Sequence, residues 1–201
     1  MVIAYVGSGG KTTLLKRRAQ ACREAGMRVF VTTSTHMFIE ADTLVTDDAQ
    51  AIIRRLEETG YAMAGTPCGE KIAPLPDEVY REVCKHADVV LVEADGSKHL
   101  PLKFPAGGEP VIYENVDEIV VVCGLHGVGR PAREVCHRLE LAKRCLGITD
   151  ETIITIDHVR TLVREGYLKP LKEKYPGKHI IVQPNHDGSP EWIALAQDFH
   201  V

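Results

Sequence analysis

The sequence predicts an α/β fold with a mostly parallel central sheet. Apolar segments of strand length alternate along the 201 residues with segments of helical spacing, a pattern typical of a parallel sheet with helices on both faces. The first strand-like run, Val2 to Val6, ends in glycines and leads into an amphipathic segment that begins near Lys11. A chain of this length fits one domain of this class.

The loop after the first strand reads Gly7-Ser8-Gly9-Gly10-Lys11-Thr12-Thr13. Glycines allow consecutive backbone N–H groups to turn inward, and the next helix directs its positive end to the same place, so such a loop binds phosphates. Lys11 would reach the outer phosphates and Thr12 would ligate Mg²⁺. We therefore expect a P-loop NTPase-like three-layer sandwich, with residues 1–201 as a single P-loop nucleotide-binding domain. The predicted nucleotide-binding residues are Gly7, Ser8, Gly9, Gly10, Lys11, Thr12 and Thr13.

The loop departs from the usual motif in one respect. The pattern G-x-x-x-x-G-K-[ST] requires a first glycine where this chain has Tyr5. The shorter form is similar to the G-T-x-G-K-T-T loop of Mur-type amide ligases. The alternative is a glycine-rich helix start with an incidental lysine, but the preceding strand and following helix favour the phosphate loop.

Composition excludes several classes of function. The chain has 24 Lys and Arg against 28 Asp and Glu, a net charge of −4, and no basic block, so we expect no nucleic-acid partner. No apolar run has the length of a membrane span and no signal peptide precedes the loop, so we expect a cytoplasmic protein without a membrane partner. The six cysteines include no C-x-x-C pair, which favours reduced thiols over a structural zinc site.

The remaining elements follow from local signals. Gly26 suits the C-terminal cap of a helix at residues 11–24, and Asp47 and Asp48 favour the start of a helix at residues 47–60. Residues 65–76 should form an exposed loop or small hairpin, and residues 97–112 a long loop. Strands are predicted at residues 28–32, 61–64, 87–93, 116–123 and 179–183, and further helices at residues 76–86, 133–146, 169–174 and 190–199 and from Thr155 to about residue 164.

Two strand ends carry candidate metal ligands. The second strand ends in Thr32-Thr33-Ser34-Thr35-His36, and the run Val89 to Val92 delivers Glu93 and Asp95 to its C-terminal end. Strand ends on the loop side of an α/β sheet line the ligand crevice. We predict Thr12, Thr35, Glu93 and Asp95 as Mg²⁺ ligands, with Glu93 preferred over Asp95. The alternatives are a capped strand end for the hydroxyls and a solvated Asp-Gly turn for Asp95.

Basic residues in the later loops are candidates for holding a phosphate or an anionic second substrate. Lys98 and Lys103 lie in the long loop, and Arg130 follows the glycine-rich exit of the strand at residues 116–123. A solvated connector is the alternative for the long loop. Cys123 and His126 are a weaker candidate for a reactive or metal-binding pair, because reactivity requires a lowered thiol pKa.

A set of motifs links these segments. Beside the phosphate loop and the hydroxyl-rich strand end stand Glu93-Ala94-Asp95-Gly96-Ser97-Lys98, Leu100-Pro101-Leu102-Lys103, Glu109-Pro110-Val111-Ile112 and His137-Arg138. Together they resemble the YqeC-type family, accessory proteins of selenium-dependent molybdenum hydroxylases. The resemblance covers most of the chain and is strongest from residue 1 to about residue 138. It adds Arg138 to the candidate contacts and implies a P-loop hydrolase or transferase, with a molybdenum hydroxylase or its maturation proteins as partners.

These observations favour an Mg²⁺-dependent nucleoside-triphosphate hydrolase or phosphoryl transferase that assists maturation of a selenium- and molybdenum-containing cofactor. Lys11 would stabilise the developing charge, and Asp95 or His36 would position the attacking group. Two alternatives stay open: a nucleotide-gated module that delivers the cofactor, and a Mur-like acyl-phosphate ligase. Both ATP and GTP fit, because Asn185-His186-Asp187 is one residue short of the guanine-reading N-K-x-D motif.

Overall fold

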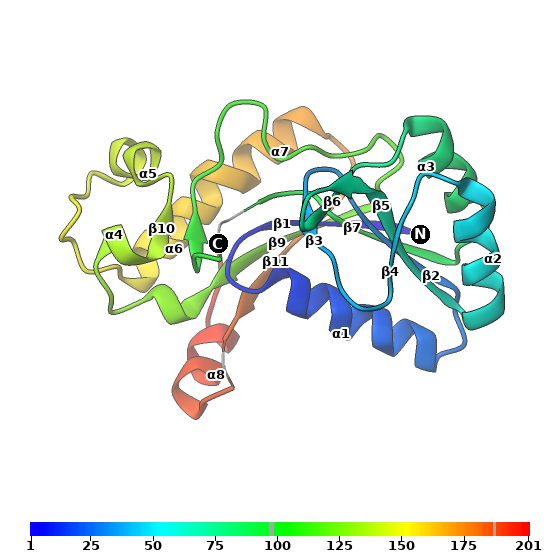
Figure 1. Cartoon of the computed structure of the whole chain (residues 1–201). Coiled ribbons are helices and arrows are strands. Elements are labelled where there is room, and N and C mark those ends of the chain that lie inside the picture. Colours follow the sequence, from blue (N-terminus) through cyan, green and yellow to red (C-terminus); the bar gives the residue numbers. More distant parts are fainter. Residues whose placement is uncertain (97–98, 187) are drawn as a thin grey trace. The chain divides into compact units, whose positions relative to one another are not determined.

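The computed structural model describes residues 1–96, 99–186 and 188–201, and its contacts divide the chain into two compact units. The first unit comprises Met1–Tyr5, Thr12–Gly96 and Val111–Asp117. The second unit comprises Val6–Lys11, Ser97–Pro110 and Glu118–Val201. The chain passes between the units at several points, one of which is the peptide bond between Lys11 and Thr12. Figure 1 shows the elements of both units.

Parallel strands form most of the sheet in the first unit. β7 (Val89–Glu93) pairs in parallel with β1 (Val2–Gly7) on one side and with β2 (Val29–Thr33) on the other. β2 pairs in turn with β5 (Tyr61–Cys68), which also pairs in parallel with β4 (Thr43–Val45). All five residues of β7 are buried, and burial of each large apolar side chain stabilises the fold by about 1.5–3 kcal/mol.

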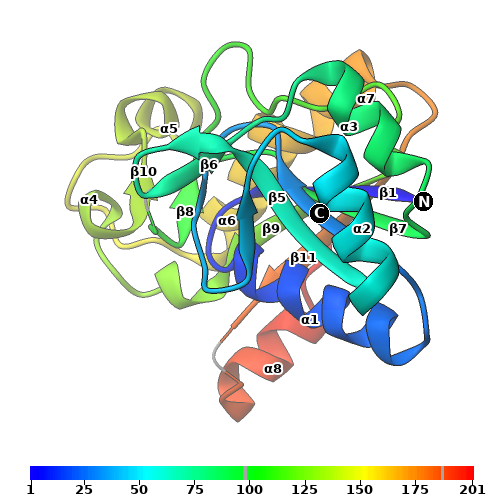
Figure 2. The ribbon, with the colours of Figure 1, turned by 45° about the vertical axis from the view of Figure 1, so that its right-hand side comes forward.

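The first unit also contains α2 (Ala49–Thr59), α3 (Asp77–Cys84) and, except for its first residue, α1 (Lys11–Glu24). The Asp48 side chain caps α2 by accepting from the backbone N–H groups of Gln50 and Ala51, and Gly60 ends it in the left-handed conformation. α2 packs against β5 and α3 (Figure 2). The helix boundaries predicted from these caps are confirmed within two residues.

The second unit contains a parallel strand pair and a series of short helices. β9 (Glu118–Gly124) pairs in parallel with β11 (His179–Asn185) over seven residue pairs. β8 (Leu102–Lys103) and β10 (Cys136–His137) form a separate two-stranded parallel sheet. The helical segments are η1 (Leu125–Gly127), α4 (Ala132–Val135), α5 (Leu139–Leu146), α6 (Ile156–Val163), η2 (Arg164–Leu168), α7 (Lys169–Lys174) and α8 (Pro190–Gln197).

The predicted α/β class with mostly parallel strands is confirmed, and two local predictions require correction. The helix expected at residues 133–146 is interrupted, because Cys136 and His137 pair with β8 and Arg138 adopts a positive φ of 60°. The long loop contains β8. In both cases a tertiary strand pairing overrides the local sequence signal. The second form predicted for residues 65–76, a small hairpin, is confirmed: β5 extends to Cys68 and pairs antiparallel with β6 (Lys71–Ala73), which also pairs with β3 (Met37–Phe38).

Within the described part of the chain, no helix has both the length and the apolar character needed to cross a membrane.

Candidate phosphate-binding loop and metal site

The glycines of the loop occupy conformations that other residues rarely adopt. Gly7, Gly9 and Gly10 have φ values of 86°, 81° and 115°. A Cβ atom on Gly7 would overlap the carbonyl oxygen of Val122, one on Gly9 would overlap Gly124, and one on Gly10 would overlap the Asn185 side chain. The loop is thus pressed against the ends of β9 and β11 in the second unit, and glycine is required at these positions by both backbone conformation and space.

Ser8, which stands between Gly7 and Gly9, is held by two hydrogen bonds. Its backbone N–H donates to the Val122 carbonyl at 2.9 Å, and its hydroxyl donates to the Pro101 carbonyl at 3.0 Å. Pro101 also accepts from the Gly124 N–H at 3.1 Å. The loop is therefore anchored to both β9 and the segment that precedes β8.

This anchoring gives a stability prediction. Gly7→Ala should lower the free energy of unfolding by about 1–3 kcal/mol more than Gly26→Ala, since overpacking a close contact has a cost of that size. Gly26 is the matched control because its φ is 78° but its Cβ would meet nothing within 4 Å. Urea unfolding of both variants measures the difference. Equal losses would mean that the contact with Val122 is not tight.

The Lys11 side chain does not face solvent. The residue is 4 % exposed, and its Nζ donates to the Gly7 carbonyl at 2.7 Å. The physical reason is helix geometry: side chains point toward the N-terminus of a helix, so a lysine at the first position of α1 folds back onto the loop. The ammonium group therefore lies within the loop whose amides it would assist.

In the first unit, Thr12 and Glu93 are joined directly. The Thr12 hydroxyl donates to Glu93 Oε2 at 2.7 Å. Glu93 ends β7 between Tyr5 of β1 and Thr33 of β2, and it is 8 % exposed. A hydroxyl and a carboxylate at this separation are two hard oxygen ligands of the kind that Mg²⁺ prefers.

The hydroxyl-rich end of β2 adjoins the Glu93 strand. Thr33 Oγ1 donates to the Glu93 carbonyl at 2.7 Å and accepts from the Thr35 N–H at 3.0 Å. The Thr33 and Thr35 hydroxyl oxygens are 3.5 Å apart, whereas the Thr32 hydroxyl is turned to the Ala64 carbonyl. The hydroxyls of Thr32 and Thr33 thus link the end of β2 to its neighbours β5 and β7. The His36 side chain is exposed.

Asp95 follows Glu93 by two residues and is 1 % exposed. It therefore does not lie in a solvated Asp-Gly turn. Glu93 and Asp95 are the two acids of this strand end, and no cluster of three or more His, Cys, Asp or Glu side chains suited to a metal occurs among the residues that the structure describes. Two acids are sufficient for Mg²⁺, because it is usually held by one or two carboxylates together with substrate phosphates and water.

The candidate cations of the later loops have different surroundings. In the second unit, the Lys103 side chain is fully buried and its Nζ lies 2.7 Å from Glu109 Oε2. Arg138 binds both carboxylate oxygens of Glu109 at 2.7 Å. Burial opposes ionisation of Glu109, but the hydrogen bonds from Lys103 and Arg138 outweigh it and hold its pKa below the ordinary value. The segment around Lys103 is thus held by ion pairs around a buried lysine and is not a solvated connector.

Lys98 lies outside the described residues. Arg130 is exposed, and its guanidinium lies 3.4 Å from the carboxylate of Glu134, four residues later in the chain. Exposed pairs of this kind contribute about 0–1 kcal/mol, so Arg130 is available at little cost for a contact elsewhere.

Burial makes Cys123 a poor nucleophile. It raises the pKa of the Cys123 thiol to about 12 and that of the Cys136 thiol to about 11. Both thiols are therefore protonated at pH 8, when an exposed thiol is partly ionised. In the folded protein at pH 8, iodoacetamide should label the exposed Cys68 first and leave Cys123 unlabelled until urea is added. Peptide mass spectrometry measures both rates, and equally fast labelling would contradict this assignment.

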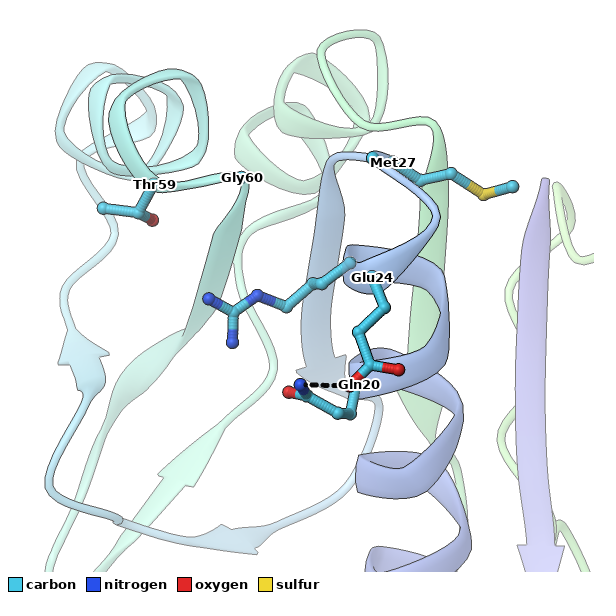
Figure 3. A pocket seen from close by; sticks show the side chains of 7 residues that line it. Gln20, Glu24, Met27, Thr59 and Gly60 are labelled. Carbon is cyan, nitrogen blue, oxygen red and sulfur yellow. Dashed lines mark hydrogen bonds between the residues drawn. The ribbon is translucent and has the colours of Figure 1, made fainter.

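A surface pocket of about 310 Å³ lies in the first unit, at the opposite end of α1 from Thr12 (Figure 3). It is formed at the C-terminal end of α1 and the end of α2, where the Arg23 guanidinium lies 4.9 Å from the Tyr61 ring centre. None of the functional-site residues predicted from sequence lines it. The lining residues are Gln20, Arg23, Glu24, Gly26, Met27, Thr59 and Gly60.

Sequence reasoning missed two residues that shape the loops. Asn185, considered only as part of a base-reading motif, donates from its amide to the Gly9 carbonyl at 2.7 Å. Glu109, noted only within a motif, is the common partner of Lys103 and Arg138. The signal for Asn185 was its place at the end of a predicted strand, where polar residues of an α/β sheet face the ligand side.

The comparisons with known proteins agree on one family. The family model of the YqeC protein matches residues 3–140, which include the loop, both strand ends and Arg138. An uncharacterized protein YqeC of Escherichia coli (strain K12) is 32 % identical over 175 residues, with 81 % of this chain and 67 % of that protein covered. The chain therefore belongs to the YqeC protein family.

Proposed function

We propose that this chain is an Mg²⁺-dependent nucleoside-triphosphate hydrolase or phosphoryl transferase. The observation that carries the proposal is the 2.7 Å hydrogen bond between the Thr12 hydroxyl and Glu93. Thr12 directly follows Lys11 in sequence, so the chain supplies a hydroxyl–carboxylate pair in addition to the loop amides and the ammonium group. This is the set of groups that phosphoryl transfer requires: amides and a cation for the phosphates, and oxygen ligands for the metal.

Each residue has a chemical role in this proposal. The N–H groups of the loop and Lys11 bind the phosphate oxygens and stabilise the charge that develops on the transferred group. Thr12 and Glu93 would hold Mg²⁺, which would neutralise the phosphates when bound. Asp95, with its carboxylate two residues beyond Glu93, would orient the attacking water or hydroxyl and accept its proton. Thr35 would be a further ligand of the Mg²⁺ ion. His36 would help to position the attacking group of the second substrate.

Membership in the YqeC family supports a place for this activity in the maturation of a selenium- and molybdenum-containing hydroxylase cofactor, the role that the resemblance implies. A molybdenum hydroxylase or one of its maturation proteins would then be the partner. The Lys103–Glu109–Arg138 cluster would shape the neighbouring loop, and Lys98 and Arg130 would contact an anionic second substrate.

Steady-state release of phosphate tests the proposal. The parent protein should turn over ATP or GTP in the presence of Mg²⁺ and lose turnover in EDTA, while Asp95→Asn should lose turnover and retain nucleotide binding. A parent that binds nucleotide but turns over only when a partner protein is added would favour the delivery module. Turnover that requires a carboxylate and an amine would favour the ligase. Turnover that is the same in EDTA would refute the metal-dependent mechanism.

A further inference from the structure

Asn185 is the last residue of β11, and it reaches across to the phosphate-binding loop. Its side-chain amide Nδ2 donates to the Gly9 carbonyl oxygen at 2.7 Å, over a separation of 176 residues in sequence. Register with Gly124 of β9 fixes the position of Asn185 at the strand end. All of these residues belong to the second unit.

The hydrogen bond controls the orientation of one peptide group. In a planar trans peptide the C=O of one residue and the N–H of the next point in opposite directions. With the Gly9 carbonyl turned toward Asn185, the Gly10 N–H must point away from it. Neither Gly9 nor Gly10 has a Cβ that would hinder rotation of this peptide, since glycine populates both signs of φ. The orientation therefore needs a partner outside the loop.

Space around Asn185 supports the same role. A Cβ on Gly10 would overlap the Nδ2 atom of Asn185, so the amide lies directly against the loop backbone. The loop residue before Gly9 is held by other groups, since Ser8 donates hydrogen bonds to the carbonyl oxygens of Val122 and Pro101. Among the hydrogen bonds of this loop given above, that of Asn185 is the one that acts on the Gly9–Gly10 peptide.

We propose that Asn185 is a positioning residue that holds the Gly9–Gly10 peptide with its N–H facing the bound phosphate. This inference rests on the proposed function. If the peptide rotated by half a turn, the Gly9 carbonyl oxygen would face the phosphate, and an attractive contact with an anion would become a repulsive one. Asn185 thus determines the affinity for the phosphates without touching them.

Nucleotide affinity in four proteins tests the role of Asn185: the parent, Asn185→Ala, Asn185→Asp and Gln183→Ala. With Mg²⁺ and ATP or GTP, Asn185→Ala should raise the Kd about ten- to hundredfold, the range expected for a lost hydrogen bond near a charged ligand. Gln183 is the matched control, because it is an exposed amide two residues earlier on β11 that bonds to the neighbouring Pro184 carbonyl. Gln183→Ala should bind as the parent does.

The pH dependence of Asn185→Asp separates positioning from a general packing role. At pH 8 its carboxylate cannot donate and would repel the Gly9 carbonyl, so affinity should be lower than in Asn185→Ala. At about pH 4, close to the ordinary pKa of an aspartic acid, about half of the carboxyl groups are protonated and can donate, so affinity should rise relative to the parent and Asn185→Ala measured at the same pH.

The outcomes of this experiment are distinct. Parent affinity in Asn185→Ala, or a pH profile of Asn185→Asp that parallels Asn185→Ala, would overturn the positioning role and leave the proposed function standing. A parent that binds neither nucleotide would overturn the proposed function, and the role of Asn185 with it.

Discussion

Replacing Lys11 by alanine is expected to weaken Mg²⁺-nucleotide binding by about a hundredfold, because a hydrogen bond to a charged group contributes about 1.5–3 kcal/mol. Turnover should fall further, by about 10²–10³-fold, since charge develops on the transferred phosphoryl group. The lysine is buried against the loop with its Nζ on the Gly7 carbonyl, so its removal leaves no other side chain of the loop to supply the charge. Calorimetric titration and phosphate release measure the two effects.

Lys16→Ala is the matched control for Lys11→Ala. Lys16 lies one and a half turns along the same helix, is 49 % exposed in its side chain, and pairs with Glu40 at 2.6 Å. A pair so exposed contributes about 1 kcal/mol or less to stability and lies outside the proposed site. Nucleotide affinity of Lys11→Ala equal to that of Lys16→Ala would refute the phosphate-loop assignment.

Glu93→Gln should lower the apparent affinity for Mg²⁺ in the nucleotide complex by about tenfold to a hundredfold. The substitution keeps the shape of the side chain and removes the charge of a carboxylate that already accepts the Thr12 hydroxyl at 2.7 Å. A charged oxygen ligand is worth several times a neutral one to a hard cation. Titration of Mg²⁺ at fixed nucleotide concentration measures the change.

Two comparisons make the Glu93 result specific. Glu24→Gln removes the same charge at the far end of α1 and should leave the Mg²⁺ titration unchanged. Asp95→Asn should retain metal-dependent binding and lose turnover, because we assign the metal to Glu93 and the attacking group to Asp95. If Glu93→Gln and Asp95→Asn both titrated Mg²⁺ normally and turned over normally, this strand end would be structural.

Local sequence signals were sufficient for most of the fold. The apolar run of β7, the glycine loop before α1, and the caps Asp48 and Gly60 of α2 act over a few residues, and such signals can be recognised in a single sequence. The interruption of the helix at residues 133–146 could not be predicted, because it depends on pairing between β10 and β8, which are far apart in sequence.

Only part of the candidate site could be predicted from the sequence, because some of its contacts depend on segments far apart in the chain. The Thr12–Glu93 pair follows from two motifs whose meeting point a parallel sheet dictates, since strand ends gather at one edge. The bond from Asn185 to Gly9 and the ion pair of Glu109 with Arg138 depend on side-chain packing between distant segments, which no local pattern encodes. Assignment of the P-loop NTPase-like three-layer sandwich as a single nucleotide-binding domain stays a prediction.

Thermal unfolding with nucleotide tests the central claim most directly. With Mg²⁺ and ATP or GTP at 100 times its Kd, the bound state should gain about 2.7 kcal/mol, which for a chain of this size raises Tm by about 5–10 °C. The rise should be smaller in EDTA, and in Lys11→Ala at the same nucleotide concentration it should fall to about 1 °C, because a hundredfold weaker Kd leaves a gain of about 0.4 kcal/mol. An unchanged Tm with both nucleotides at millimolar concentration, in the parent protein with Mg²⁺, would contradict nucleotide binding at this loop.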